Sequence, residues 1–131
     1  MPPRFGARPP LLGHARRVSS VALTANGGRA LSGSRDRSLR LWDLGKGAVS
    51  VLNVQTSDVN AVVRATVFLP DGRHALSASE DKTLRLWDLE SGRAVAVEKA
   101  SGVVLAVAVS GDGRRAAAGT YDRRVLVYDL A

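Results

Sequence analysis

The chain has 131 residues, of which 45% are hydrophobic and 24% charged, a composition typical of one globular domain and not of a disordered chain. It contains no cysteine, which excludes disulfides, thiolate metal sites and a cysteine nucleophile. The net charge is +7. All of this excess lies in residues 1–40, which carry eight arginines and one acidic residue, Asp36. A local basic excess favours an acidic partner or nucleic acid.

Residues 1–12 form a basic, Pro-rich segment without the apolar core of a secretory signal. No apolar run in the chain approaches the ~18 residues of a membrane-spanning helix. We therefore expect a cytoplasmic protein with no membrane association. Residues 13–131 are expected to form a single domain, because they contain an internal repeat.

The repeat consists of three segments that align without gaps, at residues 30–44, 75–89 and 116–130. Each segment follows a short apolar run and an Asn-Gly or Asp-Gly pair, at positions 26–27, 71–72 and 112–113. These pairs adopt positive φ at little cost, as a tight turn between antiparallel strands requires.

The first unit predicts strands at about 18–24, 30–34 and 38–44, a turn at Asp36, and a short fourth strand at 48–52. The second unit repeats this pattern and ends in a strand at 93–97. No window has a sustained 3.6-residue apolar period, so helices are not expected. The strands are apolar on both faces, because Leu39 and Leu41 alternate with Trp42 and Leu44. Such sheets must be sandwiched between others, which radial stacking provides.

The spacing Ser-x3-Asp-x5-Trp-Asp begins at Ser32 and again at Ser77, and it weakens in the third copy. Together with the Gly13-His14 pair ahead of the first unit, this pattern resembles the WD-repeat β-propeller family. The resemblance implies an all-β partial propeller of three four-stranded blades, at about 13–55, 56–99 and 100–131, with the last blade incomplete. It also implies a scaffold for protein–protein interaction that carries no catalysis of its own.

In that family the His, Ser, Asp and Trp of a unit form a buried hydrogen-bonded tetrad, a role implied here for His14, Ser32, Asp36 and Trp42. In a hairpin centred near residue 37, Ser32 lies opposite Trp42, and a buried indole N–H needs an acceptor. The second and third tetrads are degraded. Their members by position are Val59, Ser77, Asp81 and Trp87, then Ala100, Ala118, Asp122 and Tyr128. We expect stability to fall from the first blade to the third, by about 1 kcal/mol for each lost hydrogen bond.

His14, Ser32 and Asp36 are also the residue types of a hydrolase triad. A catalytic serine must be exposed and must face an oxyanion hole, whereas Ser32 is predicted in the middle of a packed strand, so the structural role is favoured. His74, beside the turn at 71–72, is expected to be a solvated loop residue. No His/Cys/Asp spacing indicates a metal site. The glycine-rich turns lack the sequence of a phosphate-binding loop, and no cofactor is expected.

The loops that enter each blade and the turns around the repeat aspartates emerge at one end of a propeller, and we predict that this end binds the partner. The predicted residues are Arg16, Arg17, Arg35, Arg37, Thr56, Ser57, Glu80, Lys82, Ser101, Tyr121 and Arg123. The arginines suit an acidic protein or peptide. The alternative is that these charges only keep the protein soluble. Nucleic acid is disfavoured, because few aromatic rings remain for base stacking.

Three blades are fewer than the four to eight of a closed propeller, and an open arc would leave two apolar sheet faces in water. Three hypotheses follow. The chain is a piece of a larger propeller, or two copies pair into a six-bladed ring, or another protein supplies the remaining blades. In the homodimer, the Pro9-Pro10-Leu11-Leu12 segment would complete the third blade of the partner.

Overall fold

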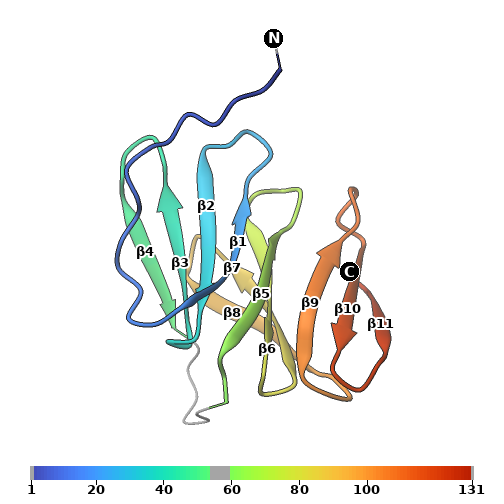
Figure 1. Ribbon diagram of the computed structural model, residues 1–131. Coiled ribbons are helices and arrows are strands. Elements are labelled where there is room, and N and C mark those ends of the chain that lie inside the picture. Colours follow the sequence, from blue (N-terminus) through green and yellow to red (C-terminus); the bar gives the residue numbers. More distant parts are fainter. Residues whose placement is uncertain (1, 54–59, 131) are drawn as a thin grey trace.

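The computed structural model describes residues 2–53 and 60–130. Within these ranges the chain forms β-strands and turns and no helix, so there is no helix that could cross a membrane. The strands pair into three antiparallel sheets that lie side by side, blades one to three (Figure 1). The predicted all-β fold with three WD-like blades is confirmed.

Each blade is a simple meander in which neighbouring strands follow one another in the chain. Blade one contains β1 (Val18–Leu23), β2 (Arg29–Ser34), β3 (Ser38–Asp43) and β4 (Val49–Asn53). Blade two contains β5 (Val63–Phe68), β6 (His74–Ser79), β7 (Thr83–Asp88) and β8 (Arg93–Lys99). Blade three contains β9 (Val104–Val109), β10 (Arg115–Thr120) and β11 (Val125–Asp129). The observed bounds lie within two residues of the predicted ones.

Two kinds of turn recur in all three blades. At one end, the β1–β2, β5–β6 and β9–β10 turns contain Gly27, Gly72 and Gly113 with φ of 70°, 65° and 72°, as the Asn-Gly and Asp-Gly pairs predict. At the other end, the left-handed residue of the turn after β2, β6 and β10 is a cation in every blade. Arg37, Lys82 and Arg123 have φ of 67°, 69° and 69°.

The predicted register of the first hairpin is wrong by two residues, because its centre lies one position earlier than expected. Ser32 pairs with Arg40, and Trp42 pairs with Ala30, so the hairpin is centred on Asp36 and not on residue 37. The reason is that Arg37 has a left-handed backbone and is part of the turn, so that β3 begins at the next residue, Ser38. Trp42 remains on the face of Ser32, two residues further along β3, because side chains alternate along a strand.

The blades pack through two different faces. Leu31, Leu39 and Leu52 of blade one form one buried cluster with Phe68 and Trp87 of blade two. A smaller cluster joins blades two and three through Ala78, Leu84, Val104 and Ala118. In each interface, the leucine-bearing face of one blade meets the opposite face of the next blade.

The outer faces of blades one and three have no blade against them in this chain. Val21 and Leu23 of β1 are 74% and 62% exposed, and Val125 and Val127 of β11 are 76% and 65% exposed. The segment before β1 forms no strand in its described part. It runs down the β4 side of blade one (Figure 1), where the Arg8 guanidinium donates to the Leu44 carbonyl (3.1 Å) and Leu11 lines a small cavity with Trp42.

Candidate functional site

The turn after the second strand of each blade is organised by its aspartate. In blade one, Asp36 Oδ1 accepts the Ser38 backbone N–H (2.9 Å) and the Ser38 hydroxyl (2.6 Å). In blade two, Asp81 Oδ1 accepts the same two bonds from Thr83 (3.1 and 2.5 Å). The hydroxyl residue two positions after the aspartate is visible in the sequence, and its part in the turn was not predicted.

The second carboxylate oxygen of Asp36 ends a chain of hydrogen bonds across blade one. The Trp42 indole N–H donates to Ser32 Oγ (2.9 Å). Ser32 Oγ lies 2.6 Å from His14 Nε2, and His14 Nδ1 lies 2.9 Å from Asp36 Oδ2. An ionised carboxylate only accepts, so the His14 proton resides on Nδ1 and the Ser32 hydroxyl donates to Nε2. The Trp42, Ser32, His14 and Asp36 atoms of this network then all have hydrogen-bond partners.

The surroundings of Asp36 control its ionisation. Burial on its own raises the pKa of this carboxyl group. The hydrogen bonds from Ser38, His14 and the Ala15 backbone N–H outweigh burial and lower the pKa to about 2. Asp36 is therefore an anion at any pH near neutrality, and it fixes the tautomer of His14.

Blade two replaces the histidine with an arginine. Trp87 still donates to Ser77 Oγ (2.9 Å), but Asp81 Oδ2 accepts from both terminal nitrogens of Arg85 (3.2 Å each). The side chains of Arg85 and Asp81 are 12% and 5% exposed, so this is a nearly buried ion pair. Val59, the predicted member of this tetrad, lies outside the described residues.

Arg40 occupies the position of Arg85 in blade one and behaves differently. His14 already holds Asp36 there, and Arg40 packs against Gly13, where an added Cβ would lie 2.9 Å from Arg40 Nη1. Arg40 Nε is buried without a hydrogen-bond partner. The same repeat position therefore supplies a carboxylate partner in one blade and a packing residue in the other.

Blade three keeps little of this arrangement. Asp122 is exposed and accepts a hydrogen bond from the Thr120 hydroxyl. This bond is the main reason that the pKa of Asp122 is lowered. Tyr128 pairs with Ala116, as Trp42 pairs with Ala30, and packs against the cluster shared with blade two. Burial raises the pKa of its phenol. The sequence-predicted members Asp122 and Tyr128 are not brought together by any hydrogen bond between described residues.

These repeated units match a family model described as WD domain, G-beta repeat, three times, at residues 9–43, 47–88 and 94–129. The three matches cover most of the chain. This chain belongs to the WD-repeat family. A curated relative is the small ribosomal subunit protein RACK1 of Drosophila melanogaster, which is 54% identical over 37 residues, or 28% of this chain. The match spans only 12% of that relative's length.

The WD-repeat tetrad of blade one has the atoms of an Asp-His-Ser hydrolase triad in the right order. Its serine is nevertheless engaged, because Ser32 Oγ accepts the Trp42 indole N–H and Ser32 is 6% exposed. A serine nucleophile must present its hydroxyl to a substrate carbonyl beside an oxyanion hole. The geometry therefore favours a structural role for all three residues.

No cluster of three metal-ligating side chains occurs among the described residues.

His74 is the first residue of β6 rather than a free loop residue. Its Nδ1 lies 2.7 Å from Asp71 Oδ2. The bond ties the start of β6 to the preceding turn, and it lowers the pKa of Asp71 against the opposing effect of burial. His74 therefore has a local structural role at a partly exposed turn.

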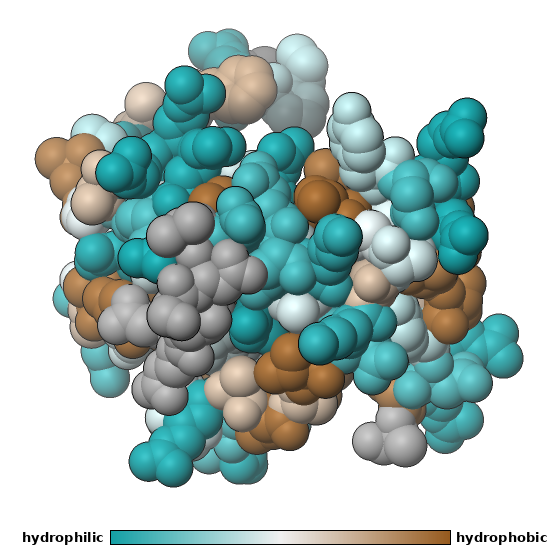
Figure 2. Space-filling model, turned by 90° about the horizontal axis from the view of Figure 1, so that it is seen from below, coloured by the Kyte–Doolittle hydropathy of each residue, from teal (hydrophilic) through white to brown (hydrophobic). Residues whose placement is uncertain are grey.

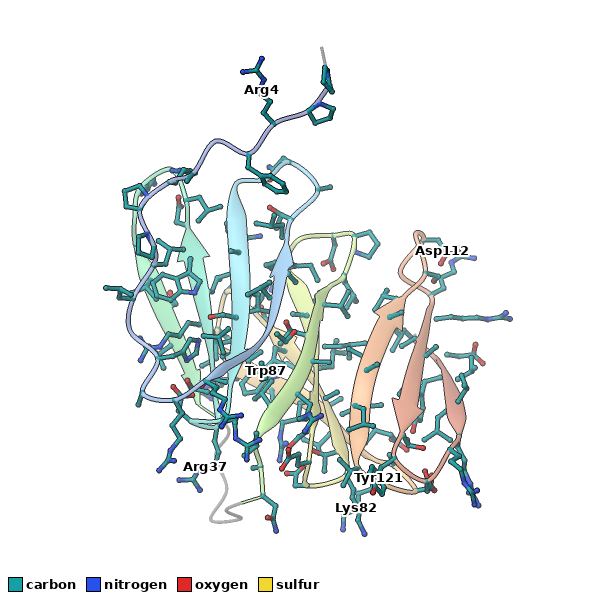
Figure 3. The ribbon with its side chains drawn as sticks, viewed as in Figure 1. Arg4, Arg37, Lys82, Trp87, Asp112 and Tyr121 are labelled. Atoms are coloured by element: carbon teal, nitrogen blue, oxygen red, sulfur yellow. The ribbon has the colours of Figure 1, made fainter. Side chains whose placement is uncertain are left out.

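The structure gathers the described members of the predicted partner-binding set at one end of the blades. Arg37, Lys82 and Tyr121 lie together at this end, far from Arg4 and Asp112 (Figure 3). The backbone N–H groups of Arg35, Glu80 and Tyr121 bond to the carbonyls of Arg17, Val62 and Val103 (3.0, 3.0 and 2.9 Å). Three equivalent turns are thereby held against three equivalent entry loops. We call this end the turn face. Thr56 and Ser57 lie outside the described residues.

Hydrophilic residues cover much of the turn face, beside smaller hydrophobic patches (Figure 2). Arg16 and Arg17 precede β1, Arg35 and Arg37 flank Asp36, and Arg123 follows Asp122. Tyr121 is 77% exposed. Glu80 is the acidic member, and its Oε1 lies 2.9 Å from Arg64 Nη1 and 3.6 Å from Arg35 Nη1. Arg64 was not predicted, because its strand position gives no sign that its side chain reaches this end.

Two hollows open at opposite ends of the blades. The larger, of about 880 Å³, lies among the Gly-containing turns and is lined by apolar residues such as Phe68, Leu69 and Pro70 together with polar and charged ones such as Asn26, Arg29 and Asp71. The smaller, of about 350 Å³, opens on the turn face and is lined by Arg17, Val18, Ser19, Arg35, Arg64 and Leu105. The charged residues that line the smaller hollow are all arginines, whereas the larger hollow has one arginine and two aspartates, Arg29, Asp43 and Asp71.

Proposed function

We propose that this chain is a non-catalytic scaffold that binds an acidic protein or peptide through the turn face. The observation that carries the proposal is the repeated left-handed cation at Arg37, Lys82 and Arg123. A left-handed backbone costs a residue with a side chain about 1–2 kcal/mol, and glycine would relieve that cost. Three cations at these positions therefore favour a role for the charge itself.

The chemistry of the turn face supports the same proposal. Arginine forks pair with carboxylates in two parallel hydrogen bonds, and an exposed tyrosine such as Tyr121 is a common anchor of protein interfaces. Among the exposed hydrophobic residues, Tyr121 is the aromatic one on this face. With few rings for base stacking, nucleic acid remains the less favoured polyanion.

The experiment is capture of partners from an extract of the native host with the purified chain. The test variant changes Arg16, Arg17, Arg35 and Arg37 to Gln. A matched control changes four arginines at the opposite end, Arg4, Arg93, Arg114 and Arg115, and removes the same net charge. We expect the test variant to lose the partner and the control to keep it, with binding that weakens steeply with added salt. Equal capture by both variants overturns the proposal, and nuclease-sensitive capture would indicate nucleic acid instead.

The outer faces of blades one and three support a second copy of the chain as a further partner. Inside the chain, the leucine face of one blade packs on the tryptophan face of the next. The open face of blade three carries Val125 and Val127, which occupy the repeat positions of Leu39 and Leu41. The outer face of blade one carries Val21 and Leu23, which are exposed, beside Trp42, which is 7% exposed. Two copies therefore present both halves of the interface that each chain already contains, as a six-bladed ring requires.

Light scattering tests the homodimer. We expect a mass of two chains that falls to one chain in Val127→Lys, while Val97→Lys on the outer strand β8 leaves the mass unchanged. Val97 is 54% exposed, similar to Val127 at 65%, which makes it a matched control. Deletion of residues 1–12 tests whether this segment completes the blade of the partner. A monodisperse single chain at high concentration would contradict the homodimer.

As the compartment of this scaffold we propose the cytoplasm, in keeping with a chain that has no cysteine.

A further inference from the structure

The smaller hollow of the turn face, which we call the axial pocket, is built by an irregularity that all three blades share. The first strand of each blade carries one extra residue relative to its neighbour. The register of β1 with β2 skips Ser19, that of β5 with β6 skips Arg64, and that of β9 with β10 skips Leu105. A bulge of this kind redirects a side chain away from the pleat.

The three redirected residues are the ones that meet in the axial pocket. Ser19, Arg64 and Leu105 all line it, although they are 45 and 41 positions apart in the sequence. β1, β5 and β9 are neighbouring strands, so equivalent bulges point to a common place. In blade two the residue at the bulge is Arg64. The regular alternation of side chains along a strand would not by itself predict that Arg64 reaches the axial pocket.

Two further guanidinium groups join Arg64 in the lining of the axial pocket, those of Arg17 and Arg35. The counter-charge is Glu80, whose Oε1 is shared between Arg64 (2.9 Å) and Arg35 (3.6 Å). Three cations and one anion leave a net charge of about +2 in the pocket. The Arg17 side chain makes no ion pair with any described residue, and Arg35 and Arg64 are 44% and 38% exposed.

The hydroxyl of Ser19 is not available to bind an anion, because it is hydrogen-bonded to backbone carbonyls. It donates to the Gly33 carbonyl (3.2 Å) and to the Val63 carbonyl, which holds the bulge of β1 against β5. Leu105 closes the side of the axial pocket that faces blade three. The polar lining that remains free to bind is therefore the guanidinium set.

We infer that the axial pocket is a binding site for one phosphomonoester group of a partner polypeptide, which Arg17, Arg35 and Arg64 would hold. The inference deepens the proposed function and rests on it. A phosphomonoester carries a charge of about −1.5 to −2 near neutrality and three acceptor oxygens, which matches three arginine forks and a net charge of about +2. A carboxylate or a phosphodiester carries a single negative charge and leaves the pocket half neutralised.

Glu80 influences how strongly this binding site holds an anion. Its carboxylate orients Arg35 and Arg64 in the empty pocket, and it competes with the incoming anion for the same guanidinium groups. Removing its charge while keeping its shape, in Glu80→Gln, frees both arginines and raises the net charge of the pocket by one. We therefore expect this variant to bind the anion more tightly.

The test uses small probes and the whole chain without any partner, at constant ionic strength and pH 7.5. Inorganic phosphate is compared with dimethyl phosphate and acetate, and the readout is the saturable shift of the arginine Nε–H resonances. We expect phosphate to shift those of Arg17, Arg35 and Arg64 and to bind at least about fivefold more tightly than the two singly charged probes.

Substitutions then assign the site. Arg17→Gln and Arg64→Gln should each weaken phosphate binding about tenfold, the usual effect of losing a charge-assisted hydrogen bond. Glu80→Gln should strengthen binding severalfold. The matched control Arg114→Gln removes the same charge at the opposite end and should stay within about twofold. Circular dichroism spectra and melting curves show that each variant is folded.

Three results would overturn the inference. The first is no saturable phosphate binding, the second is equal binding of dimethyl phosphate or acetate, and the third is equal loss in Arg114→Gln. Failure here is distinct from failure of the proposed function. If phosphate does not bind but the four-arginine variant still loses its partner, the turn face stands and the axial pocket does not. If phosphate binds but the four-arginine variant still captures the partner, the axial pocket binds the anion and the proposed role of the turn face is wrong.

Discussion

The tetrad positions of blades one and two show how individual residues solve the same local problem. Both of these blades have a nearly buried carboxylate at the repeat aspartate, and that carboxylate needs hydrogen-bond donors. Blade one uses His14, which also orders Ser32 and Trp42 into a chain of donors. Blade two uses Arg85, which reaches Asp81 from within β7. Charge-assisted bonds of this kind are stronger than neutral ones, and so the loss of the histidine in blade two is offset by a charged partner.

Substitution of the two equivalent arginines, Arg85 and Arg40, by methionine should change the free energy of unfolding by different amounts. Arg85→Met leaves the Asp81 carboxylate short of two hydrogen bonds, and we expect it to cost about 2–3 kcal/mol of unfolding free energy. Arg40→Met keeps the packing of the stem and removes a buried Nε without a partner, so we expect a change within about 0.5 kcal/mol of zero or a gain. Urea unfolding of both variants measures the difference, and equal costs would contradict it.

The ionisation of Asp36 predicts a specific loss of stability in acid. Its pKa is lowered to about 2 in the folded chain, against about 3.9 for an unfolded aspartate. Its contribution of about 2 kcal/mol is therefore complete above about pH 4 and is lost as the pH falls through the folded value near 2. The stability difference between the wild type and Asp36→Asn, from urea midpoints between pH 2.5 and 7, should shrink below pH 4. A difference that stays constant with pH would refute this.

Among the elements, the contact between β2 and β5 sets how closely two blades approach. Gly33 of β2 lies where an added Cβ would be only 2.4 Å from Val63 Cγ1. The equivalent residues are Ala78 in blade two and Gly119 in blade three. At Gly119 a Cβ would lie 3.8 Å from the Ala106 Cβ, an ordinary contact. The first interface is therefore packed without room for a methyl group, and the third blade has that room.

The two glycines give a matched pair of substitutions. Gly33→Ala forces β2 and β5 apart and should cost about 1–3 kcal/mol. Gly119→Ala meets no clash and restricts the unfolded chain, so we expect it to be neutral or stabilising by up to about 1 kcal/mol. Thermal unfolding compares them. A large loss of stability in Gly119→Ala would show that blade three is packed as tightly as blade one.

In the whole molecule, stabilising contacts are concentrated between blades one and two. Among the described residues, the first cluster contains nine buried residues, Trp87 included, whereas the second contains four buried residues, two of them alanines. Blade three also lacks the Trp–Ser hydrogen bond, because Ala118 and Tyr128 stand in those positions. Burial of apolar area is the main stabilising contribution, so blade three has the least to hold it in place.

Hydrogen exchange should therefore show blade three opening before the rest of the chain. We expect backbone amides of β9–β11 to exchange at least about tenfold faster than those of β2, β3, β6 and β7. The measurement is made by mass spectrometry at concentrations where light scattering gives the mass of one chain. Equal protection of all three blades would contradict the expectation and would mean that the smaller cluster is sufficient.

Much of the architecture was predictable because its causes are local. Alternating apolar residues require strands, and the Asn-Gly and Asp-Gly pairs supply the positive φ of the turns that join them. The spacing of Ser32 and Trp42 also indicated a shared face, since both depend on the period of one hairpin. Three repeats of this pattern indicated three stacked blades, which the family match and the sheets bear out.

Other features depend on neighbours that are remote in the sequence. The pairing of Ser32 with Arg40 follows from a left-handed Arg37, which no local preference of arginine predicts. Whether an arginine bonds to the aspartate or packs beside glycine depends on a histidine more than twenty positions away. The meeting of Ser19, Arg64 and Leu105 requires three sheets side by side. Pattern and turn chemistry act over a few residues and thus specify the strands, whereas bulges and shared ion pairs form only when blades pack together.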